Sequence, residues 1–255
     1  MSTAQYLRPY LRSRVRFGVR FAVALLIGFG IVRFALVLQA NVTGAYNFVS
    51  IVFVAMALAP WVLLTRDGRR AIGIRRPTRW WGLPFALATG AAACTGVFAL
   101  ASALWQQTTS NPFAYIAGSY SAVPAELSAD SRVIYFVIFA VIGMVFSPIG
   151  EEFLYRGIAH DALASGLGER RAALIEAAAF ALVHLAHFGI VYVSGAWAFL
   201  PGPAVFWLAA MFGAALLFLA HRRLTGSVWG AVVAHAGFNV AMTALIFFWL
   251  PGFPF

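Results

Sequence analysis

The chain contains no lysine and few charged residues of any kind. Charged residues make up 10% of its 255 positions, and hydrophobic residues make up 62%. Soluble domains average about 25% charged residues, so the composition excludes a soluble domain and indicates a protein with several membrane spans. The net charge of +10 comes wholly from arginine. Because the arginines lie between apolar runs, membrane topology and anionic lipid headgroups explain them, and we expect no nucleic-acid partner.

Other absences exclude several kinds of site. Cys94 is the only cysteine, which rules out an intrachain disulfide and a thiolate metal cluster; we interpret it as a packing residue. The HExxH zinc motif is missing, and so is GxGD. Ser227 precedes an apolar run in a position typical of a helix N-cap, which does not suggest a nucleophile.

Seven apolar runs are long enough to cross a bilayer, which takes roughly 17 to 25 residues. They lie near 17–38, 45–64, 80–105, 132–153, 172–191, 203–221 and 226–250. The fold class predicted is an all-α, polytopic membrane helix bundle with about seven transmembrane helices. The number becomes eight if the last run divides or if residues 189–202 re-enter the membrane.

The arginines alternate between the loops. They occur in the N-terminal tail, in the loop 66–79, at 170–171 and at 222–223, whereas the loops near 39–44, 106–131 and 192–202 have none. Cytoplasmic loops are rich in Lys and Arg. The pattern therefore predicts a multi-pass protein of the cell inner (cytoplasmic) membrane with a cytoplasmic N-terminus.

The stretch "SPIGEEFLYRG", residues 147–157, places three ionisable groups at the end of an apolar run. On a helix, Glu152 and Arg156 share a face, so Arg156 neutralises Glu152 and leaves Glu151 without a helical partner. Pro148 and Gly150 predict a kink or a fresh helix start just before the pair. The alternative is a charge cluster at the membrane interface.

Two later runs carry buried polar groups. "FALVHLAHF" holds His184 and His187, and "HAGFN" holds His235 and Asn239 four positions apart. Each has a simpler explanation, a packed histidine in the first and an interhelical hydrogen bond in the second. Together with Glu151 they supply a base and hydrogen-bond donors, which is the set needed to activate water for hydrolysis.

"EEFLYRG", "FALVH" and "HAGFN" stand in that order on successive apolar segments. In this the chain resembles the CPBP family of intramembrane proteases, which includes CAAX-processing and bacteriocin-processing enzymes and is also described as glutamic-type. The family motifs EExxxR, FxxxH and HxxxN are all matched. The resemblance covers roughly 135–245, so we divide the chain into N-terminal helices of unknown role, 1–130, and a catalytic core, 131–250.

The resemblance implies a role for each motif residue. Glu151 activates water with help from His184, His235 and Asn239 hold the developing oxyanion, and Glu152 and Arg156 form a supporting pair. No cofactor is certain. Glu151, His184 and His235 would also make a ligand set for a divalent metal such as zinc, although we favour catalysis that is independent of metal or only assisted by it.

The function predicted is an endopeptidase in the lipid bilayer that cleaves a membrane-anchored peptide or protein. Two alternatives use the same buried groups, namely a proton-coupled transporter and a non-catalytic membrane scaffold. The depths of the motif residues in their runs predict a cavity that opens at the cytoplasmic end of the bundle.

Overall fold

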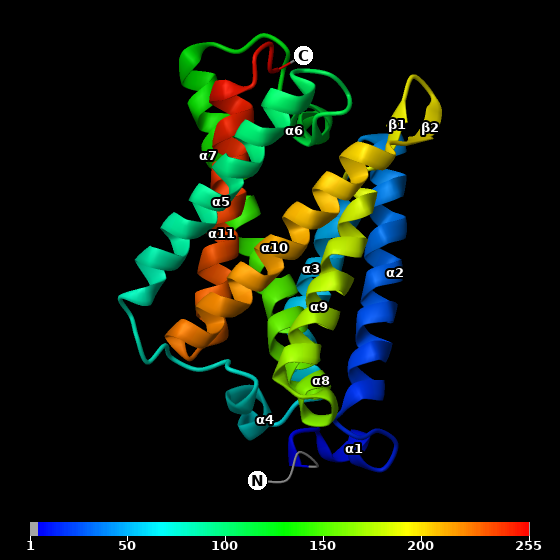
Figure 1. The fold of residues 1–255 in the computed structure, drawn as a ribbon, viewed down its shortest axis with the longest axis vertical. Helices are drawn as coiled ribbons and strands as arrows, with labels where there is room; N and C mark the ends of the chain where they lie inside the picture. Colours follow the sequence, from blue (N-terminus) through cyan, green and yellow to red (C-terminus); the bar gives the residue numbers. More distant parts are fainter. Residues whose placement is uncertain (1–4, 255) are drawn as a thin grey trace.

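The computed structural model describes residues 5–254, which form a bundle of long helices with one small hairpin (Figure 1). The elements in chain order are α1 (Pro9–Arg12), α2 (Val19–Thr43), α3 (Asn47–Leu63), α4 (Arg66–Ala71), α5 (Gly82–Trp105), α6 (Pro112–Ala117), the 3-10 turn η2 (Gly118–Tyr120), α7 (Ala129–Glu152), the π-helix η3 (Phe153–Ala159), α8 (His160–Leu167), α9 (Glu169–Val183), the 3-10 turn η4 (His184–Ala186), β1 (Ile190–Val193), β2 (Ala196–Phe199), α10 (Pro201–Thr225) and α11 (Val228–Trp249).

The all-α membrane bundle predicted from the sequence is confirmed. Within residues 5–254, five helical segments are long and apolar enough to cross a membrane: α2, α5, α10, α11 and the continuous stretch Ala129–Leu167. The other two apolar runs form the 17-residue α3 and the 15-residue α9. The total of seven spans therefore stays a prediction. Residues 189–202, considered as a re-entrant segment, contain the antiparallel β1–β2 hairpin.

The helices form two halves that are joined by a crossing helix. One half contains α5, α7 and α11, and the other contains α2, α3, α8 and α9 (Figure 1). Helix α10 runs diagonally between them and contacts both α9 and α11. The end that carries α1 and α4 is called the arginine-rich end below. The opposite end, with α6 and the hairpin, is called the arginine-poor end.

Glycines allow the helices to approach backbone to backbone. A Cβ at Gly90 of α5 would overlap the carbonyl oxygen of Ala234 in α11, and one at Gly150 of α7 would overlap that of Phe53 in α3. Small residues at such crossings are the common way in which membrane helices pack. The close backbone contact at Gly150 therefore joins α7 of one half to α3 of the other half.

Helix α7 corrects one local expectation. No new helix starts at Pro148, because α7 continues through Pro148 and Gly150 to Glu152. The change comes one residue later, where the π-helix η3 begins at Phe153. Such π segments inside helices are often found at functional sites. Two other expectations are confirmed, since Cys94 is fully buried and the Ser227 side chain caps α11.

Candidate active site

The motif residues come together from three parts of the chain. Glu151 and Glu152 are the last two residues of α7, His184 follows the end of α9, and His235 lies on α11. Both glutamates are completely buried, and His184 and His235 are 8% and 4% exposed. Buried charges persist only when they are paired or hydrogen-bonded, so the partners of each group define the site.

The two oxygens of Glu151 face different partners. Oε1 lies 2.9 Å from Nη2 of Arg33, which reaches across from α2. Oε2 accepts a hydrogen bond from the Ser147 hydroxyl at 2.9 Å and lies 3.7 Å from Nε2 of His235. Sequence reasoning left Glu151 without a helical partner. The structure supplies one from a helix 118 positions earlier.

Arg33 also contacts two histidines. Its Nη2 lies 3.1 Å from Nε2 of His184 and 3.3 Å from Nε2 of His187. A guanidinium only donates hydrogen bonds, so both imidazole nitrogens accept. For His184 the proton then sits on Nδ1, which donates to the Phe180 carbonyl at 2.6 Å. His184 is thereby a neutral imidazole with a fixed tautomer.

Glu152 joins the second histidine to the supporting arginine. Its Oε1 accepts from Nδ1 of His235 at 2.8 Å and from Nη1 of Arg156 at 3.2 Å. The predicted pairing of Glu152 with Arg156, one helical turn apart, is present. The link to His235 was not foreseen. It orients the imidazole, whose ring also stacks on Phe218 with centroids 4.7 Å apart.

Arg156 faces a third buried carboxylate that sequence reasoning missed. Its Nε lies 3.5 Å from Oε2 of Glu176 on α9, and both side chains are fully buried. The guanidinium also lies over the Phe180 ring at 4.2 Å. Oε1 of Glu176 is 3.9 Å from His160, which in turn contacts the exposed Glu169 at 3.1 Å. A line of ionisable side chains therefore runs from His235 to the arginine-rich end.

Asn239 is placed differently from the other motif residues. Its Nδ2 donates to the backbone carbonyl of Gly143 at 2.9 Å, which ties α11 to α7. The arrangement matches the interhelical hydrogen bond considered as the simpler explanation of "HAGFN". The amide nitrogen carries a second N–H, and Asn239 also lines the cavity described next.

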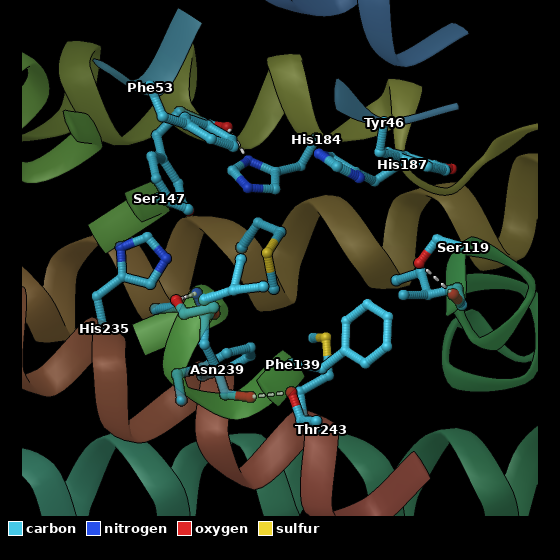
Figure 2. A pocket seen from close by; sticks show the side chains of 18 of the residues that line it. Tyr46, Phe53, Ser119, Phe139, Ser147, His184, His187, His235, Asn239 and Thr243 are labelled. Atoms are coloured by element: carbon cyan, nitrogen blue, oxygen red, sulfur yellow. Dashed lines mark hydrogen bonds between the residues drawn. The ribbon is translucent and has the colours of Figure 1, made fainter. Parts of the chain in front are cut away.

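A cavity of about 290 Å³ lies beside these groups, between the two halves of the bundle. In Figure 2 His184 and His187 lie on one side and Asn239, Phe139 and Thr243 on the other, with His235 and Ser147 toward one end and Ser119 toward the opposite end. Several lining residues come from positions before 131: Arg33, Tyr46, Phe53, Ile116, Ser119 and Tyr120. The wall thus draws on both sides of the predicted division at residues 130 and 131.

The proposed zinc ligands do not fit a metal ion in this arrangement. Within residues 5–254, no three His, Cys, Asp or Glu side chains are grouped so that they could hold one. Glu151 Oε1 and His184 Nε2 both contact the Arg33 guanidinium, at 2.9 Å and 3.1 Å. A divalent cation shared by these two atoms would be repelled by the guanidinium that lies between them.

The missed residues had a signal in the sequence. Arg33 and Glu176 are charged residues inside apolar runs, where a charge is costly and usually marks a function or a partner. Ser147 stands one helical turn before Glu151, within reach of its carboxylate. Nothing in the sequence tells which charges pair across helices, so only the fold reveals that Arg33 belongs with Glu151.

Comparison with known proteins identifies one family. The family model described as type II CAAX prenyl endopeptidase Rce1-like matches residues 133–241, a segment that contains all six motif residues. Searches of curated proteins and of solved structures found no match. The matched segment agrees with the extent of the resemblance seen in the motifs. The region that carries the site is therefore similar to the Rce1-like endopeptidases, and this match supports a CPBP-family intramembrane protease.

Proposed function

We propose that this multi-pass membrane protein is an endopeptidase that hydrolyses a peptide bond of a membrane-associated substrate. One observation carries the proposal. His184 and His235 line a cavity, and the buried Glu151 lies directly behind its wall, in contact with the lining residues Arg33, Ser147 and His235. A positioned carboxylate, imidazoles and a cavity are the parts that water-activated hydrolysis requires.

Glu151 acts as the base through Oε2. Oε1 is held by Arg33, whereas Oε2 is next to Ser147 and His235, both of which line the cavity. A water molecule hydrogen-bonded to Oε2 adds through its oxygen to the carbonyl carbon of the substrate, and its proton passes to Glu151. When the C–N bond breaks, Glu151 returns that proton to the leaving amine.

The remaining polar groups of the site stabilise the negative charge that develops on the substrate carbonyl oxygen. The second N–H of Asn239 stabilises the oxyanion. His235, whose Nδ1–H is donated to Glu152, adds a donor there only in its doubly protonated form, through Nε2–H. His184 works through Arg33, since its Nε2 accepts a hydrogen bond from that guanidinium. This assignment moves His184 from direct help with water activation to positioning.

The line of ionisable groups from His235 to Glu169 favours one alternative, a proton-coupled transporter. Arg156 stands in that line between Glu152 and Glu176. A guanidinium does not release its proton in a protein. The line is therefore interrupted for proton transfer, and the hydrolytic function is the better supported one.

The test is cleavage of membrane-anchored peptides by the purified protein in detergent, wild type against Glu151→Gln. The glutamine keeps the shape of the side chain and a polar oxygen next to Arg33 but removes the base, so we expect a folded protein with cleavage at the background rate. Glu126→Gln is the matched control, because it removes the same charge at an exposed position. Substantial cleavage by the Glu151 variant would refute the mechanism. Proton flux in vesicles without any peptide cleavage by the wild type would favour the transporter.

We also propose that the protein lies in the inner membrane with its arginine-rich end in the cytoplasm, as the arginine pattern predicts. The arginine-rich end carries the exposed Arg76, and the arginine-poor end carries the exposed Gln107. Cysteines at these two positions, in a Cys94→Ala background, report the orientation. An impermeant thiol reagent added to intact cells should label only the cysteine at 107; labelling of only the one at 76 means that the orientation is inverted.

A further inference from the structure

The cavity is closed toward the arginine-rich end. Below the two glutamates lie Arg156, fully buried between Glu152 and Glu176, and the fully buried Tyr155 and Ile158 of the π-helix η3. None of these residues lines the cavity. The sequence predicted an opening on this side. The buried side chains of η3 pack directly under the site on the side where that opening is expected.

The cavity continues toward the arginine-poor end instead. Tyr46, in the loop between α2 and α3, and Ser119 and Tyr120 of η2 line it there. Figure 2 shows Ser119 at the end opposite to His235. On the α7 side the wall includes Ile142, which is also 45% exposed on the outer surface of the bundle. The cavity thus leads from the catalytic groups to the arginine-poor half of the membrane.

Most of the cavity wall is apolar. Its lining includes Ile116, Phe139, Met211, Phe238 and Met242, with the polar Asn239 and Thr243 on the same side as Phe139 in Figure 2. The ionisable groups of the cavity are Arg33, His184, His187 and His235. Such a wall favours apolar side chains by burial, whereas charged side chains would lose their hydration without gaining a partner.

We propose that the substrate is an apolar peptide segment that enters from the arginine-poor end and brings its scissile bond to the inner end of the cavity. This proposal rests on the proposed hydrolytic function and adds the side of entry and the chemistry of the bound segment. The peptide carbonyl reaches Glu151 and His235 last. The side chains on the entry side of the scissile bond lie against Phe139 and Met242.

The first experiment measures access and does not depend on catalysis. A cysteine replaces Met242 on the cavity wall, in the Cys94→Ala background. The matched control is Ile246→Cys, one turn further along α11, because Ile246 is fully buried and does not line the cavity. The cysteines at Gln107 and Arg76 calibrate the two sides of the membrane in the same vesicles of known orientation.

We expect the cysteine at 242 to react with a small impermeant thiol reagent from the same side as the one at 107, and the cysteine at 246 not to react. Reaction from the side of the cysteine at 76, or from neither side, overturns the proposal. A negative result here leaves the test with Glu151→Gln intact, so the two proposals fail separately.

The second experiment tests whether the apolar cavity wall binds the substrate, by measuring KM and kcat. Met242→Trp narrows the apolar part of the cavity and leaves the ionisable groups in place. We expect KM for a membrane-anchored apolar peptide to rise at least tenfold, with a smaller change in kcat. An unchanged KM, or preference for a peptide with charged residues next to the scissile bond, would show that the wall does not contact the substrate.

Discussion

Glu151 and Glu152 are neighbours in the chain but belong to different regions of the molecule. Glu151 is at the cavity and pairs with Arg33, which comes from another half of the bundle. Glu152 is in the floor below the cavity and pairs with Arg156, one helical turn away on its own segment. Each arginine holds a carboxylate, yet one pair is next to the reacting groups and the other is enclosed by packed side chains.

The surroundings of the two arginine–glutamate pairs indicate that the pairs have different roles. The floor pair is surrounded on every side, since Arg156 contacts Glu176 and lies over Phe180. The cavity pair has partners that themselves face the cavity, namely Ser147 and the two histidines on Arg33. We infer that the floor pair mainly stabilises the fold, whereas the cavity pair mainly positions the base.

The largest effect is expected for Arg156→Gln. The change leaves Glu152 and Glu176 buried and facing each other without a cation, and breaking a buried pair costs roughly 3–5 kcal/mol. The free energy of unfolding in detergent should fall by that order, with loss of folded protein at growth temperature. The control is Arg223→Gln, because the pair of Arg223 with Glu169 is largely exposed and such pairs contribute little. If both variants unfold at the temperature of the wild type, the floor pair is not structural.

A smaller but specific effect is expected for Arg33→Gln. Without the guanidinium, Glu151 Oε1 loses its ion-pair partner and His184 and His187 lose a common donor, so the base is no longer held in place. Misplacement of a reacting group by about 1 Å costs on the order of 10²-fold in rate. We therefore expect kcat to fall by about 100-fold, with a modest change in KM and in unfolding temperature.

Arg33→Lys sharpens this test. A single ammonium lacks the planar fork of a guanidinium, so it cannot reproduce contacts to one carboxylate and two imidazoles together. It should restore only part of the activity of the wild type. Full activity in Arg33→Gln would show that the cavity pair does not position Glu151.

The smallest effect is expected for Glu176→Gln. Arg156 donates a hydrogen bond to Glu152, whereas its contact with Glu176 is longer, and neither oxygen of Glu176 has a hydrogen-bond partner among the described residues. Glutamine at position 176 keeps the shape of the side chain and removes one of the two negative charges next to Arg156. The free energy of unfolding should change by less than about 1 kcal/mol. Chemical unfolding of Glu152→Gln under the same conditions gives the comparison, and equal losses for both variants would contradict the assignment of Glu152 as the main partner.

Local patterns predicted much of the fold and part of the site. Every apolar run became a helix, residues of the three motifs contact one another, and Arg156 bonds to Glu152 as the four-residue spacing requires. The sequence did not predict the hairpin at 189–202, because the periodicity of a short apolar segment does not distinguish a strand from a helix. No new helix begins at Pro148, because α7 is continuous through the proline to Glu152 and packs against α3 at Gly150.

The sequence by itself determined that this is an all-α membrane protein whose segment 133–241 is similar to a family of intramembrane proteases. Hydropathy, charge distribution and helical spacing are local properties, so they can be read along the chain. Only the tertiary structure decided that Arg33 holds Glu151, that Glu152 orients His235, and that the cavity leads to the arginine-poor end. These depend on how helices distant in the sequence pack together, because a buried charge takes whichever partner the neighbouring helix presents.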